Sequence, residues 1–159
     1  MSMEDLIEGI QLTKKFESDF VGRQSELLIS SAEVALGITF PLTYKKFLLE
    51  LGCGNIGCKE FYEIINEDFY NSGIPDAVWI TMQERRDSEL PQPMVIVCND
   101  GMGNYHVIDT VVQNQNGENP IKIWTPGVSG ATNEMIKIAD DFGIFFLKEV
   151  REVCYEAGK

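Results

Sequence analysis

The side chain types that most often carry catalysis are sparse in this sequence. His106 is its only histidine, so any Ser-His-Asp or Cys-His mechanism would have to use it. It lies between Tyr105 and Val107 in a segment with strand character, where alternation places it on the opposite sheet face from both neighbours. We expect it either to face water or to be a satisfied polar group near the sheet edge, without a catalytic role.

Carboxylates are abundant, but their spacing does not indicate an acid–base pair. Adjacent acids such as Asp140-Asp141 generally point apart, and this pair is better explained as the cap and first-turn charge of a last helix. Residues 100–104, Asp-Gly-Met-Gly-Asn, look superficially like a phosphate loop but lack its lysine and the following helix. No calcium loop of the form D-x-[DN]-x-[DN]-G is present. We therefore expect no enzyme.

The four cysteines do not form a recognisable metal or disulfide pattern. Cys53 and Cys58 have four residues between them, which is not the tight C-x-x-C spacing of zinc sites, and no histidine is near them in sequence. The first twenty residues show no signal-peptide pattern, so reduced thiols are expected. These observations predict no cofactor and no metal.

The negative charge is concentrated in the middle of the chain. The formal net charge is −12, and residues 60–118 hold 11 acids against only Arg85 and Arg86, a net of −9. Such a surface repels nucleic acid and anionic membranes and attracts basic proteins, although acidity also simply keeps proteins soluble. No uninterrupted apolar run could span a bilayer. We expect a cytoplasmic protein with a basic protein partner and no nucleic-acid or membrane partner.

Aromatic residues are frequent in the same acidic region. Most of them should be core, but any that stay exposed beside acids would form a protein-binding hot spot, because Tyr and Trp anchor interfaces and carboxylates engage arginine and lysine. The residues expected to form this partner surface are Glu67, Asp68, Tyr70, Asp76, Trp79, Glu84, Asp87 and Asp100.

Helices expected at both ends of the chain flank the region that contains these residues. Apolar spacing predicts helices over residues 3–20, 25–36, 41–51 and 139–156, with Ser25 as an N-cap and Gly37 as a left-handed stop. The charged segment 82–90 is a candidate for a short exposed helix.

Between these helices the pattern becomes extended and is interrupted by turn residues. Strands are expected over residues 61–65, 77–81, 94–98, 104–112 and 120–124. The short connections imply an antiparallel meander, since parallel strands need longer crossovers. The order predicts one α+β domain over residues 1–159, in which amino-terminal helices and a carboxyl-terminal helix pack on a central antiparallel sheet.

Several short motifs resemble those of the SUKH superfamily. They are residues 33–48, Glu-Val-Ala-Leu-Gly-Ile-Thr-Phe-Pro-Leu-Thr-Tyr-Lys-Lys-Phe-Leu, followed by Gly-Cys-Gly at 52–54, the hairpin at 100–109 and the segments 120–124 and 138–142. Phe40 stands where leucine is usual before the proline. The resemblance implies an α+β domain of the kind found in yeast cell-wall regulators related to the Smi and Knr proteins, and in bacterial immunity proteins that neutralise polymorphic toxins, often nucleases.

Together these observations favour an immunity-type protein that binds a cognate toxin domain directly and blocks it. A non-catalytic adaptor, like the cell-wall regulators, would use the same surface for another partner. An enzyme acting on a small cationic or metal-bound substrate is the second alternative. A neighbouring gene for a long secreted protein with a toxin-like carboxyl-terminal domain would favour the first hypothesis.

Overall fold

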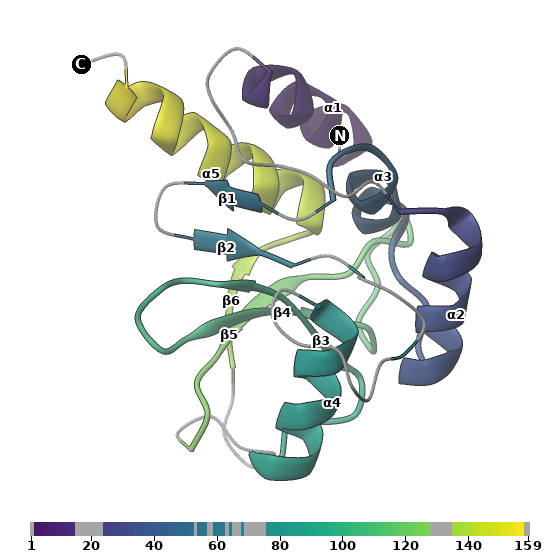
Figure 1. Ribbon diagram of the computed structural model, residues 1–159. Helices are drawn as coiled ribbons and strands as arrows, with labels where there is room; N and C mark the ends of the chain where they lie inside the picture. The colour runs from purple at the N-terminus through teal and green to yellow at the C-terminus, as the bar shows by residue number, and fades with distance from the viewer. Residues whose placement is uncertain are drawn as a thin grey trace.

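A six-stranded antiparallel sheet organises the chain (Figure 1). The computed structural model describes residues 2–14, 24–52, 54–56, 59–62, 64, 68, 76–127 and 135–157. Strand order in the sheet follows chain order, as the meander predicted from the turns requires. The strands are β1 (Gly54–Ile56), β2 (Lys59–Phe61), β3 (Met94–Asn99), β4 (Tyr105–Asp109), β5 (Ile121–Trp124) and β6 (Ile136–Ala139).

Helices cover both faces of this sheet. Side chains of α1, α2, α3 and α5, together with Val78 of α4, form one core with the first face, whereas Ala77 and Ile80 of α4 pack on the opposite face over β3 and β4. The α+β class is confirmed, but the expectation did not place a helix on the second face. The helices are α1 (Ser2–Thr13), α2 (Glu26–Leu36), α3 (Leu42–Glu50), α4 (Ala77–Asp87) and α5 (Phe142–Ala157).

The expected limits of α2 are confirmed by its caps. The Leu28 amide donates to the Ser25 side chain at 3.1 Å, and Gly37 ends the helix with φ of +70°. α1 ends at Thr13, short of the predicted limit, and residues 15–20 lie outside the described part of the chain.

The strand expected over residues 77–81 is wrong, because these residues form the first half of α4. Four of the five are buried, and a short run buried almost all round has no periodicity that distinguishes helix from strand. β1 and β6 were missed for a related reason: each is too short for a pattern. β6 ends at Ala139, the residue expected to begin the last helix. That helix begins instead at Phe142, because Ala139 pairs with β5.

Phenylalanine rings join the helices to the first face of the sheet. Phe47 of α3, Phe61 of β2 and Phe146 of α5 are all buried, with ring centroids 5.3–5.8 Å apart. α1 closes this layer by packing tightly on α5, where the Cα of Gly143 lies against the backbone of Ser2 and leaves no space for a Cβ. These contacts fix the sheet that carries the candidate site.

A buried carboxylate far along the chain caps α3. Pro41 holds the N-cap position without a side-chain hydrogen bond, and Glu118, from the β4–β5 connection, takes over that role. The Thr43 hydroxyl donates to its carboxylate at 2.5 Å and the Thr43 amide at 3.4 Å. Burial raises the pKa of Glu118 against the opposing effect of these hydrogen bonds, and nearby Asp141 raises it further.

The raised pKa of Glu118 predicts a specific pH dependence of stability. A carboxyl whose pKa is higher in the folded state favours folding while protonated, and this contribution is lost as pH rises from about 4 through the folded pKa. Glu118→Gln keeps an acceptor for Thr43 without the charge. We expect its stability relative to wild type to increase with pH, measured by urea unfolding between pH 4 and 7. Parallel curves would contradict this, and Glu152→Gln, at an exposed carboxylate, controls for the loss of one charge.

Candidate functional site

Four acids of the acidic middle region are buried and belong to the structure of the fold. They are Asp76, Asp100, Asp109 and Glu118, none more than 6% exposed. Asp76 is fully buried and accepts hydrogen bonds from the amides of Val78 at 2.8 Å and Trp79 at 3.0 Å. It is the N-cap of α4, so its proposed place on a partner surface is corrected.

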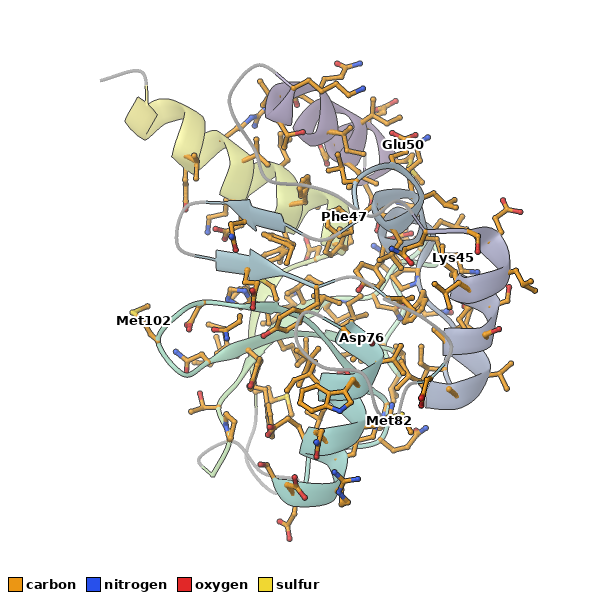
Figure 2. The ribbon with its side chains drawn as sticks, viewed as in Figure 1. Lys45, Phe47, Glu50, Asp76, Met82 and Met102 are labelled. Carbon is orange, nitrogen blue, oxygen red and sulfur yellow. The ribbon has the colours of Figure 1, made fainter. Side chains whose placement is uncertain are left out.

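Asp100 likewise serves the β3–β4 turn. Its carboxylate accepts from the amides of Met102 at 2.7 Å and Asn104 at 3.1 Å, and from the Asn104 side chain at 2.8 Å. Burial would raise the pKa of Asp100, but these hydrogen bonds outweigh it and lower the pKa. Met102 extends from the hairpin tip (Figure 2), whereas Asp100 is turned inward and is also corrected.

The other six predicted residues differ in where they lie. Glu67 and Tyr70 lie outside the described residues, and Asp68 is exposed. Trp79, Glu84 and Asp87 all belong to α4, with Asp87 exposed and the other two partly buried. The structure therefore brings three of the eight predicted residues together on one helix.

The stripe of α4 that faces the sheet positions Glu84. Ala77 and Ile80 are buried against the second sheet face, and Glu84 follows them at i+7 and i+4, respectively, on the same side of the helix. Glu84 thus reaches the sheet where the helix ends, instead of pointing directly into solvent.

Aromatic rings from the strands meet this stripe of α4. Tyr62 and Trp124 are fully buried, while Trp79 and Tyr105 are partly exposed and pack against the same cluster. Tyr105 of β4 pairs with Trp124 of β5 in register, and their rings stack with centroids 5.9 Å apart at 24°. We call Tyr62, Trp79, Tyr105 and Trp124, together with Glu84, the aromatic face.

The sequence contained a signal for the strand residues of this face. Tyr105 and Val107 lie on one side of β4, and antiparallel pairing with β5 brings Trp124 opposite Tyr105. The register between β4 and β5 determines that the two rings are in contact, and this register could not be predicted from the sequence pattern.

The two arginines of α4 are directed away from Glu84. Arg85 donates to the carbonyls of Leu36 at 3.0 Å and Gln92 at 2.5 Å, and Arg86 donates to Asp87 and Gln83. Across the described parts of the chain, the buried Oε2 of Glu84 has no hydrogen-bond partner. Burial raises the pKa of Tyr105, and the charge of Glu84, which faces the same side of the sheet, raises it further. The aromatic face therefore holds a carboxylate without a counter-charge.

His106 lies on the other side of the sheet from this site. It is 3% exposed in the central strand β4, and its ring meets Phe145 of α5 at 4.9 Å. The expectation of a position near the sheet edge is therefore corrected. Among the described residues, no group of three or more His, Cys, Asp or Glu side chains could hold a metal ion. The described helices include none with the length and apolarity needed to cross a membrane.

Comparison with known proteins supports the resemblance seen in the sequence. The family model SUKH_6, described as SMI1-KNR4 cell-wall, matches residues 26–146, which are more than three quarters of the 159 residues. The match includes α2, α3, α4 and every strand, and thus the whole aromatic face. No curated protein sequence matches the chain.

The division between structural and surface acids on α4 can be tested by unfolding. Asp76→Ala removes the carboxylate that caps two amides, and should lower the free energy of unfolding by about 1–2 kcal/mol. Asp87→Ala, at the exposed end of the same helix, should change it by less than about 0.5 kcal/mol. Urea denaturation measures both, and equal losses in the two variants would contradict the assignment.

Proposed function

The chain belongs to the SMI1-KNR4 family of SUKH domains, and on this basis we propose that it is an immunity-type protein that binds a basic toxin domain and neutralises it. The family is known in immunity proteins and in cell-wall regulators. The observation that carries the proposal is the aromatic face, where partly exposed aromatic rings lie beside the acids of α4.

The remaining surface charge suits a basic partner. With four acids used inside the fold, the acids left at the surface of the middle region include Asp68, Glu84, Asp87 and Glu89. Three of these lie on the second half of α4 or directly after it, on the helix whose first turn carries Trp79. The negative charge is therefore more local than the sequence alone indicates, and the same helix presents an aromatic side chain that can be desolvated on binding.

A nuclease toxin has the complementary properties. Its active cleft must be basic to hold phosphates, so an acidic protein surface can occupy the same electrostatic field and exclude the nucleic acid. Electrostatic steering would speed the encounter, and aromatic anchors would slow dissociation. An adaptor would use the same face without inhibiting its partner.

Co-expression with the toxin-like domain encoded by an adjacent gene tests the proposal. We expect this chain to restore growth and to form a complex with the purified domain. Glu84→Lys/Asp87→Lys should slow association at low salt by about 10-fold or more and weaken its salt dependence, because it reverses two charges on the binding face. Stopped-flow measurements at several salt concentrations provide the rates.

A matched control separates local charge from net charge. Glu26→Lys/Glu152→Lys makes the same change of net charge on α2 and α5, at exposed acids away from the aromatic face. It should associate within about twofold of wild type. Equal slowing by both double variants would refute the acidic-face proposal. A complex that forms without protecting the cells would favour the adaptor.

A further inference from the structure

The tyrosine of the aromatic face is supported from one side. Trp124 is fully buried and stacks on Tyr105 at 5.9 Å, so one face of the phenol ring is covered and its orientation is held by the sheet. Part of the remaining surface of Tyr105 is exposed. A ring held in this way offers a flat, pre-oriented surface to a planar or cationic group.

The stripe of α4 that packs on the same side of the sheet as this ring ends in Glu84, a carboxylate that the described part of the chain leaves unsatisfied. Glu84 has a buried oxygen with no hydrogen-bond donor, although two arginines flank it in sequence. Arg85 is held by the carbonyls of Leu36 and Gln92, and Arg86 is paired with Asp87. Glu84 is only partly buried, so a donor on a partner can approach its carboxylate from the exposed side. An acceptor that is left unsatisfied costs free energy, and a charge-assisted hydrogen bond to this carboxylate recovers part of that cost.

We infer that the aromatic face is a binding site for one arginine side chain of the protein partner, whose guanidinium stacks on Tyr105 and donates to Glu84. This deepens the proposed function, since it specifies the group through which the partner is recognised. The guanidinium is planar and permanently charged, and it can donate two parallel hydrogen bonds to a carboxylate while stacking on an aromatic ring.

The chemistry of the site favours arginine over other side chains. An apolar side chain would cover Tyr105 but leave Glu84 buried without a donor. Lysine would supply a charge, but its ammonium cannot stack and carries a stronger hydration shell into the site. Only a guanidinium meets the ring and the carboxylate together.

The two tryptophans of the chain make the site directly observable. Trp79 and Trp124 are the only tryptophans, and both belong to the aromatic face. We would titrate the full chain with the peptide acetyl-Gly-Arg-Gly-amide and record intrinsic fluorescence. The matched peptides carry citrulline, which is a neutral analogue of arginine, or lysine. We expect a saturable change with arginine, a response at least about 10-fold weaker with lysine and none with citrulline.

Variants of the chain assign the response to the proposed contacts. Glu84→Gln should weaken binding of the arginine peptide at least about 10-fold, and Tyr105→Leu should do the same by removing the stacking surface. Glu26→Gln removes an exposed charge on α2 and should bind as wild type. Circular dichroism and urea unfolding check that each variant is folded. Loss of binding in one folded site variant is enough to support the assignment.

The results distinguish this inference from the proposed function. An absent response, or equal responses to the arginine, lysine and citrulline peptides, overturns the arginine site even if the chain still protects cells from the toxin. Binding of the arginine peptide without protection by any adjacent toxin domain would instead support the site and refute the immunity function. Unchanged binding in both Glu84→Gln and Tyr105→Leu overturns the assignment to these residues.

Discussion

The structure depends on covering a sheet that is apolar on both faces. Phenylalanines of α3 and α5 cover the first face around Phe61, and α4 covers the second around Ile96 and Val107. Each helix must therefore begin at a defined point over the sheet, and buried carboxylates fix these points. Asp76 starts α4, and Glu118 reaches across the fold to start α3. The burial of acidic groups follows from the need to hold helices on both sides.

Because several acids are buried for this reason, the net charge overstates the negative charge of the surface. A value of −12 indicates a strongly acidic surface, but the buried acids cap helices, close turns or, like Asp109, pair with Lys122 at 2.8 Å. The formal net charge does not distinguish buried acids from exposed ones, because both contribute equally to it. The acids that remain on α4 act next to aromatic rings, where removal of water strengthens their interactions.

The sequence was informative wherever one local interaction decides the structure. Ser25 and Gly37 mark α2 because their capping bonds are made within a few residues. The meander followed from the closely spaced turns. Long-range contacts could not be predicted in this way: Glu118 meets α3 from 75 residues away, and Tyr105 meets Trp124 through strand register. Trp79, Glu84 and Asp87, which the sequence predicts at a partner surface, lie on one helix, although residues 77–81 were expected to form a strand.

The simple strand order has a consequence for synthesis of the protein. Every residue of the aromatic face precedes β6 and α5 in the chain, and each strand pairs with the one made just before it. On the ribosome the second sheet face can thus be assembled under α4 while the first still lacks α5. The nascent chain then carries the proposed recognition surface before its phenylalanine core is closed. Until α5 packs on the sheet, Phe61 and its neighbours are exposed to aggregation or to chaperones.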